Sequence, residues 1–138
     1  MAKRFPRHYF EPSAILAWLK RETIDGDDRW WHCWQLLEQA RRGESVIYTS
    51  GLTLVEVTGG KGKSSGVHVP AGFDNTRDVV RAFFENEYIE IVEAGRVVGE
   101  LARQLIWDFP TLTAFDATHF ASALDAECDV LTPTTTTF

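Results

Sequence analysis

Three acidic residues stand at places where carboxylates of a metal site are expected. Glu11 follows a short extended segment at 9–10, Glu56 lies just beyond a β-rich run at 45–49, and Asp116 opens a late helical segment. Clustered carboxylates repel one another unless a cation neutralises them. Mg²⁺ prefers such oxygen ligands and keeps waters in its remaining positions. If the three acids converge, the sequence predicts a divalent-cation site.

Each of these acids also has an ordinary explanation. A single Asp or Glu is most often a solvated surface charge or a helix cap. What favours the site is that all three acids coincide with the ends of predicted strands. In α/β folds, functional groups gather at the carboxyl ends of parallel strands.

The first half of the chain alternates β-rich runs with segments of helical spacing. Pro12 suits the first turn of a helix, where its missing N–H costs nothing. Gly43 stands where a left-handed helix cap is expected, after two arginines. The expected elements are an extended piece at 9–10, a helix at 12–19, a turn at 25–28, a helix that buries Trp30, Cys33, Trp34 and Leu37, a strand at 45–49 and, with Ser50 as its cap, a helix at 52–57.

The second half continues this alternation after a glycine-rich segment at 59–72, which predicts a flexible loop. Strands alternating with helices indicate a parallel sheet covered on both faces. We therefore expect one α/β domain over 1–138, a three-layer αβα arrangement with a central parallel sheet of four to five strands and a tail at 133–138. The remaining elements are a helix at 74–86 with Val79, Val80, Phe83 and Phe84 inward, a strand at 88–92, a helix at 94–109, a helix from Thr113 with Ala117, Phe120, Ala121 and Leu124 on its apolar face, and a strand at 129–132.

Composition narrows the class of protein. The 138 residues are 44% hydrophobic and 25% charged, which is an ordinary globular balance. The net charge of −6 argues against a binder that holds nucleic acid by basic charge alone. Cys33 and Cys128 belong to no Cys/His cluster, so a zinc site is not expected. No apolar run is long enough to span a membrane, and the sequence predicts a reducing, cytoplasmic setting.

Three motifs together resemble the PIN-domain family, especially the VapC-like toxin ribonucleases of toxin–antitoxin pairs. The first is YFEPSAIL at 9–16, a strand, an acid, a serine and an apolar helix. The second is IYTSGLTLVE at 47–56. The third and most specific is FDATHFASAL at 115–124, followed by ECDVLT at 127–132 as the family's last strand. The likeness runs from about residue 8 to the end, with the motifs in order.

This resemblance implies a function. Relatives cleave single-stranded RNA with Mg²⁺ or Mn²⁺, so Glu11, Glu56 and Asp116 would be the catalytic metal ligands. The resemblance makes Ser13, Ser50 and Thr134 supporting or substrate-positioning residues. It also implies a homodimer and a cognate antitoxin protein. Helices near the chain start form the antitoxin groove in such relatives, which makes Trp31 a candidate partner contact.

Two residues depart from the family pattern. The first acid is usually Asp, whereas Glu11 carries one more methylene, and Thr134 stands where a further Asp is usual. A hydroxyl is a weaker, neutral ligand. The alternative reading is therefore a catalytically degenerate PIN domain that binds RNA or protein. A small-molecule phosphatase is a third reading, but the sequence lacks a nucleophilic Asp motif.

Two further features invite other functions. The triplet Gly62-Lys63-Ser64 looks like part of a phosphate-binding loop, but Val57 stands where that motif requires glycine, so we predict an ordinary loop. His119 lies one helical turn after Asp116. A fourth metal ligand or a general acid is conceivable there, but the sequence favours a histidine at the helix surface or half-buried.

Overall fold

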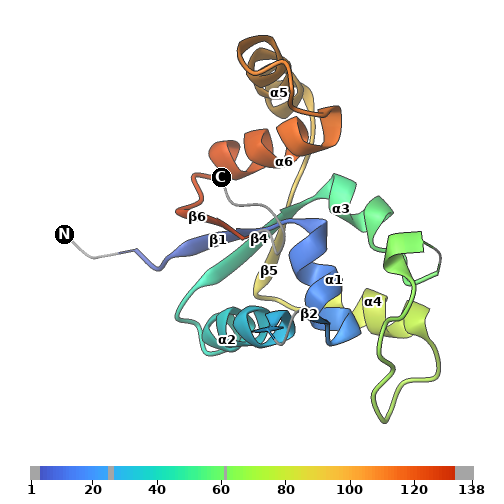
Figure 1. Cartoon of the computed structure of the whole chain (residues 1–138). Helices are drawn as coiled ribbons and strands as arrows, with labels where there is room; N and C mark the ends of the chain where they lie inside the picture. The colour runs from blue at the N-terminus through green and yellow to red at the C-terminus, as the bar shows by residue number, and fades with distance from the viewer. Residues whose placement is uncertain (1–3, 25–26, 61, 133–138) are drawn as a thin grey trace.

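The computed structural model describes residues 4–24, 27–60 and 62–132 (Figure 1). It confirms the alternation of strands and helices. The elements are β1 (Arg7–Phe10), α1 (Pro12–Lys20), β2 (Thr23–Ile24), β3 (Asp27–Asp28), α2 (Arg29–Arg41), β4 (Val46–Ser50), α3 (Gly51–Glu56), the short 3₁₀ helix η1 (Gly62–Ser64), α4 (Thr76–Phe84), β5 (Ile89–Val92), α5 (Arg96–Asp108), α6 (Ala114–Asp125) and β6 (Val130–Thr132).

The central sheet is parallel throughout. Within the described residues it has four strands in the order β5-β4-β1-β6. Tyr9 of β1 pairs with Tyr48 of β4 on one side and with Leu131 of β6 on the other. The chain moves outward from β1 through β4 to β5 and then returns to place β6 beside β1. The carboxyl ends of β1, β4 and β6 consequently meet at the point where the strand order reverses.

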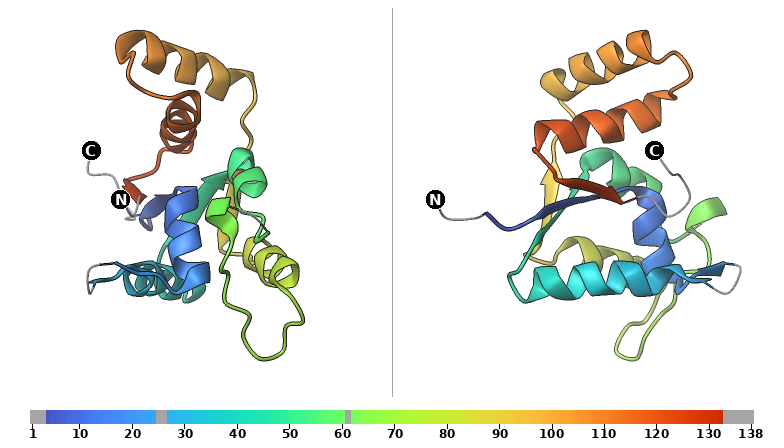
Figure 2. Two further views of the ribbon diagram at one scale, coloured as in Figure 1. Left: turned by 45° about the vertical axis from the view of Figure 1, so that its right-hand side comes forward. Right: turned by 60° about the vertical axis from the view of Figure 1, so that its left-hand side comes forward.

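Helices cover both faces of this sheet, so the predicted three-layer arrangement is confirmed (Figure 2). The helices α1, α2 and α4 cover one face. On the other face α6 lies between the sheet and α5, which forms the outermost layer. This arrangement places the start of α6 above the carboxyl ends of the strands.

Each face of the sheet has its own apolar core. Strand alternation divides β1 between them, because successive side chains point to opposite faces. Phe10 belongs to the core under α1, α2 and α4, whereas Tyr9 reaches the α6 side, where its hydroxyl contacts His119. The second core consists of Val92, Val98, Ala102, Ala117 and Ala121.

The helix boundaries follow from local capping. Pro12 occupies the first turn of α1, as predicted. Gly43 takes a φ of 77° just after α2, which a residue with a Cβ rarely adopts. The Ser50 hydroxyl accepts a hydrogen bond from Leu52 N, which confirms that the segment after β4 begins as a helix and not as a strand. Thr113 caps α6 in the same way by accepting from Asp116 N.

Some local expectations need correction. Leu124 was expected on the apolar face of α6 but is 57% exposed, because that side of the helix end faces solvent. Ser122 and Ala123 are buried there instead. A turn was predicted at 25–28, but Asp27 and Asp28 form β3, which pairs antiparallel with β2. Residues 25–26 lie outside the described residues. None of the described helices is long and apolar enough to cross a membrane.

Candidate active site

The three predicted acids lie at the ends of three different helices, close to the point where the strand order reverses. Glu11 is the residue between β1 and α1, Glu56 is the last residue of α3, and Asp116 lies in the first turn of α6. All three line one pocket of about 580 Å³. The structure therefore brings together acids that lie far apart in the sequence.

Glu11 is the most deeply placed of the three acids. Only 7% of its surface is exposed, and its backbone N–H donates to Thr132 O at 3.5 Å, which ties the end of β1 to β6. Burial raises the pKa of the Glu11 carboxyl to about 7, and the negative charges of Asp116 and Glu56 add to this effect. A buried carboxyl beside two other acids is a place where a bound cation would relieve electrostatic strain.

Glu56 and Asp116 are more accessible than Glu11. The Glu56 side chain is 30% exposed, and the Asp116 side chain lies at the open side of the pocket. Asp116 sits in the first helical turn, where the helix dipole favours a negative charge. Exposure to solvent thus increases from Glu11, which is buried, to Glu56 and Asp116, which are accessible.

His119 joins this site, and the prediction of a surface or half-buried histidine was wrong. It is only 2% exposed and lines the same pocket. Its Nδ1 lies 2.7 Å from the Tyr9 hydroxyl and its Nε2 lies 3.4 Å from Glu56 Oε1. Burial lowers the pKa of His119 and raises that of Tyr9 to about 12. The signal in the sequence was the one-turn spacing from Asp116, but the burial depended on the packing of α6 against β1.

The acids have the right chemistry for a divalent cation such as Mg²⁺ or Mn²⁺. They are hard oxygen donors, and such ions commonly bind through one or two carboxylates with waters completing the shell. As they stand, no three His, Cys, Asp or Glu side chains within the described part of the chain converge into a ready ligand set. The fit therefore rests on donor type, on the shared pocket and on the raised pKa of Glu11.

The predicted supporting residues have different placements. Ser13 lines the pocket. Ser50 is fully buried and its hydroxyl is used to cap α3, so it supports the helix that carries Glu56. Thr134 lies outside the described residues.

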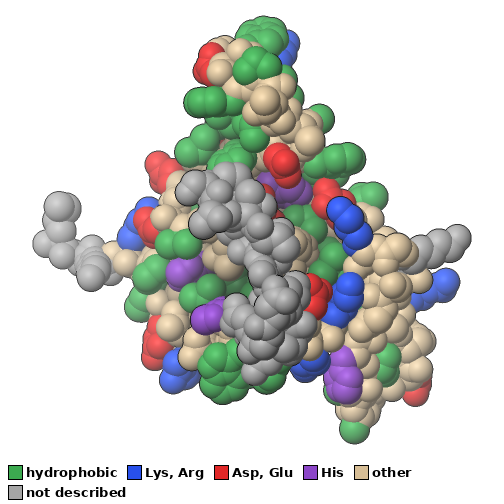
Figure 3. All heavy atoms as spheres, viewed as in Figure 1, with side chains coloured by type: hydrophobic (Ala, Val, Ile, Leu, Met, Phe, Trp, Pro, Cys, Tyr) green, Lys and Arg blue, Asp and Glu red, His purple; other side chains and the backbone are tan. Residues whose placement is uncertain are grey.

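Basic side chains stand beside the acids. Lys20 and Lys63 both line the pocket, and the Lys20 ammonium donates to Lys63 O at 3.1 Å. Figure 3 shows basic, acidic and histidine side chains gathered on this face of the molecule. A pocket that is lined by both carboxylates and lysine ammonium groups suits a phosphate that is bridged to a cation.

The Gly62-Lys63-Ser64 triplet has a local structural role. It forms η1, and the buried Ser64 hydroxyl donates to Glu56 O at 2.7 Å and accepts from Thr58 N. These bonds attach the glycine-rich segment to the end of α3 and place Lys63 at the pocket. The sequence analysis predicted that this triplet is not a phosphate-binding loop. The structure agrees in that the Ser64 hydroxyl is used in bonds to the protein backbone.

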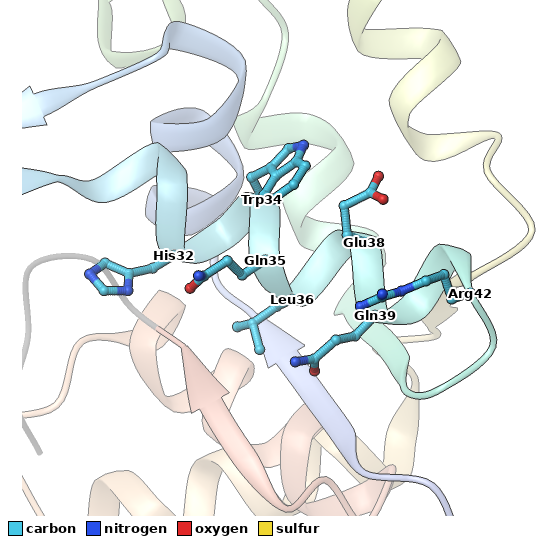
Figure 4. Close-up of a pocket in the computed structure, with 7 residues that line it drawn as sticks. All are labelled: His32, Trp34, Gln35, Leu36, Glu38, Gln39 and Arg42. Carbon is cyan, nitrogen blue, oxygen red and sulfur yellow. The ribbon is translucent and has the colours of Figure 1, made fainter.

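A second hollow, of about 560 Å³, is lined by residues of α2 and by Arg42, which follows it (Figure 4). In that view Leu36 and Gln39 point to one side of the helix, and Trp34 and Glu38 point to the other. Trp31 is 44% exposed and stacks on Trp34, with ring centroids 4.8 Å apart. The hollow lacks the acid cluster, so it is a candidate contact surface and not a catalytic one.

The sequence also matches a known protein family. The sequence profile of the PIN domain family matches residues 11–133, which include every described member of the pocket. A search of curated protein sequences gives no match.

Two solved structures share the fold. The crystal structure of Mycobacterium tuberculosis VapC20, described as a sarcin-ricin loop cleaving toxin, has a TM-score of 0.64 and 16% identity, and the match covers 91% of this chain and 88% of that one. VapBC2 from Rickettsia felis, bound to a DNA fragment from its promoter, has a TM-score of 0.57 and 16% identity over 91% of this chain and 86% of that one. At such identity the likeness concerns the fold.

Proposed function

Because the chain belongs to the PIN domain family, we propose that it is a divalent-metal-dependent endoribonuclease, a hydrolase of phosphodiester bonds in single-stranded RNA. The observation that carries this proposal is the shared pocket of Glu11, Glu56 and Asp116, with the pKa of buried Glu11 raised to about 7. Uncompensated acids of this kind are typical of functional sites.

Glu11, Glu56 and Asp116 would hold Mg²⁺ or Mn²⁺. When bound, the ion would supply an activated water and neutralise charge on the phosphate. The buried position of Glu11 fixes one ligand at the floor, where the tie between Glu11 N and Thr132 O limits backbone movement. Asp116 at the rim leaves the remaining side of the pocket open to the substrate.

Other residues of the pocket would hold the RNA. Lys20 and Lys63 provide positive charge for a backbone phosphate. Phe115 is 59% exposed at the pocket rim, next to Asp116, and offers a ring on which a base can stack. Single-stranded RNA fits this combination because its bases are free to leave the backbone and stack.

We further propose that the chain is the toxin of a type II toxin–antitoxin pair. The fold it shares with VapC20 and with the VapC-containing VapBC2 complex supports this role. The exposed Trp31 and the hollow along α2 supply a surface for the antitoxin. Large aromatic side chains are enriched at the energetic centres of protein interfaces. The free thiols of Cys33 and Cys128 accord with a cytoplasmic setting.

A homodimer is part of the same proposal. The outer helix α5 and its turn into α6 expose large apolar side chains, namely Val97 (66%), Trp107 (63%) and Phe109 (58%). Exposed apolar patches of this kind mark interaction surfaces. A second copy that buries α5 would cover them without blocking the pocket between α1 and the start of α6.

The alternative is a degenerate PIN domain that binds RNA or protein without cutting. It is favoured by one observation, the lack of a converged ligand set among the described residues. The two functions differ in a direct assay with labelled single-stranded RNA in Mg²⁺, Mn²⁺ or EDTA. The nuclease cuts with either metal and stops in EDTA. Folded, partner-free protein that binds the RNA but leaves it intact with both metals would establish the binding module.

A further inference from the structure

A chain of side-chain contacts leads from the sheet interior to one of the candidate ligands. The Tyr9 hydroxyl lies 2.7 Å from His119 Nδ1, and His119 Nε2 lies 3.4 Å from Glu56 Oε1. Tyr9 is fully buried in β1, a central strand of the sheet, and His119 is 2% exposed. These contacts therefore connect a central strand of the sheet to a residue at the pocket.

The contact between Tyr9 and His119 allows two arrangements of hydrogen atoms. Either the tyrosine O–H donates to Nδ1 and the histidine proton lies on Nε2, or Nδ1 carries the proton and donates to the tyrosine oxygen. In the second arrangement a neighbouring hydroxyl must accept the tyrosine proton, and the hydroxyls of Ser50, Ser122 and Thr49 all lie within hydrogen-bonding reach of Tyr9. Ser122 can do so, because its own hydrogen is already given to Thr118 O at 2.7 Å.

Glu56 decides between these arrangements. An ionised carboxylate only accepts hydrogen bonds. If Nε2 carried no proton, its lone pair and Glu56 Oε1 would be two hydrogen-bond acceptors facing each other. If Nε2 carries the proton, it can donate to Oε1. The separation of 3.4 Å is at the long end for an N–H···O bond, so the contact orients the carboxylate without clamping it.

We propose that His119 is a positioning residue, held by Tyr9 as the Nε2–H tautomer so that its N–H orients the carboxylate of Glu56. The inference rests on the proposed function, because the purpose of orienting Glu56 is to preorganise a metal ligand. Hydrogen bonds from outside the ligand set are known to orient ligating groups and raise metal affinity. Both ring nitrogens of His119 are engaged in this arrangement, which separates its role from that of a fourth ligand.

The tautomer can be observed in metal-free protein. Histidine-selective ¹⁵N labelling with two-bond ¹H–¹⁵N correlation distinguishes Nδ1–H from Nε2–H rings, and the His119 signal is assigned by its loss in His119→Gln. The expected result is a single Nε2–H tautomer. Tyr9→Phe keeps the ring in the core but removes the hydroxyl, and it should shift the Nδ1 resonance. A dominant Nδ1–H tautomer, or two tautomers in exchange, would overturn the proposal.

Metal affinity supplies the second test, with Mn²⁺ alone as the probe in calorimetry. His119→Ala should weaken binding by about 10- to 100-fold, in line with other residues that orient ligands. His119→Gln places an amide N–H near Nε2 and should recover most of the affinity. Tyr9→Phe should lose about three- to tenfold, as expected for one buried hydrogen bond. Far-UV circular dichroism establishes that each variant is folded.

The outcomes separate this inference from the function on which it rests. Wild-type protein that binds Mn²⁺ and cuts RNA, with His119→Ala and Tyr9→Phe binding Mn²⁺ as tightly as wild type, would overturn the positioning role alone. Wild-type protein that neither binds Mn²⁺ nor cuts RNA would overturn both proposals. Graded loss of affinity together with the Nε2–H tautomer supports both.

Discussion

His119 Nε2 lies 3.4 Å from Glu56 Oε1, so the middle of α6 and the end of α3 meet at a candidate metal ligand. One helical turn before His119, the exposed Asp116 lines the same pocket as buried Glu11. The site is thus assembled from helices that follow two central strands and from one that precedes the last strand. Its chemistry depends on how those helices begin and end.

The stability of the metal-free protein should fall as pH rises, because of Glu11. Its pKa is raised to about 7 in the folded chain, from an ordinary value of 4.5. Folding therefore favours the protonated form: the stabilisation is complete below about pH 4.5 and is lost as pH rises through about 7. Glu11→Gln removes this dependence. At pH 8 its free energy of unfolding should exceed that of wild type by at most on the order of 3 kcal/mol.

Urea unfolding at pH 5 and pH 8 in EDTA measures this difference. The comparison between wild type and Glu11→Gln cancels the other titrating groups. Addition of Mn²⁺ at pH 8 should restore stability to wild type but not to Glu11→Gln, because a ligand stabilises the state that binds it. Equal pH dependence in both proteins would show that Glu11 lies in a more solvated setting than the structure indicates.

The cap of α6 should matter for both stability and activity. Thr113 Oγ1 accepts a hydrogen bond from Asp116 N at 3.1 Å and thereby fixes the turn that carries the carboxylate. Thr113→Ala should lower the free energy of unfolding by about 1 kcal/mol. It should also lower RNA cleavage, because Asp116 loses its defined place. Thr113→Ser keeps the hydroxyl and serves as the control, and a serine variant as impaired as the alanine variant would count against the cap.

Lys63 should contribute to substrate binding more than to the chemical step. Lys63→Ala should raise KM for a short single-stranded RNA by about tenfold, the loss of one hydrogen bond to a charged group, with kcat nearly unchanged. Arg42→Ala, which removes an exposed cation just after α2 and away from the acidic pocket, is the matched control. An unchanged KM in Lys63→Ala, or an equal rise in the control, would remove Lys63 from the RNA-binding surface.

The dimer proposal predicts a change of mass with one substitution. Val97 on α5 is 66% exposed, and Val97→Glu should turn a wild-type dimer into a monomer in sedimentation velocity. Val55→Glu on α3 is a suitable control, because Val55 is 72% exposed on a different helix. A wild-type monomer at high concentration would contradict the proposal.

The sequence predicted the fold well because its signals were local. The β-rich run before Ser50, the hydroxyl cap at that residue and the glycine after α2 each fix a boundary through backbone chemistry, and the structure confirms them. Pro12 likewise begins α1. Functional groups of α/β folds gather at the carboxyl ends of parallel strands, which predicted that Glu11, Glu56 and Asp116 would lie together. In the structure all three line one pocket.

What the sequence could not supply depends on tertiary packing. The burial of His119 follows from the way α6 lies over β1, where alternation turns Tyr9 towards that helix. The exposure of Leu124 has the same origin at the other end of α6, since neither the sheet nor α5 covers it there. Helical spacing identifies a face of a helix but not the extent to which neighbouring elements cover it.

Asp116→Asn tests most directly whether these acids hold the ion needed for RNA cleavage. Asp125→Asn, the same exchange in the last turn of α6, is the control. With labelled single-stranded RNA and Mn²⁺, wild type and Asp125→Asn should cut, whereas Asp116→Asn should lose at least about 100-fold in rate and most of its Mn²⁺ affinity. Cleavage by Asp116→Asn at the wild-type rate would contradict the account, because the ion would then be held elsewhere.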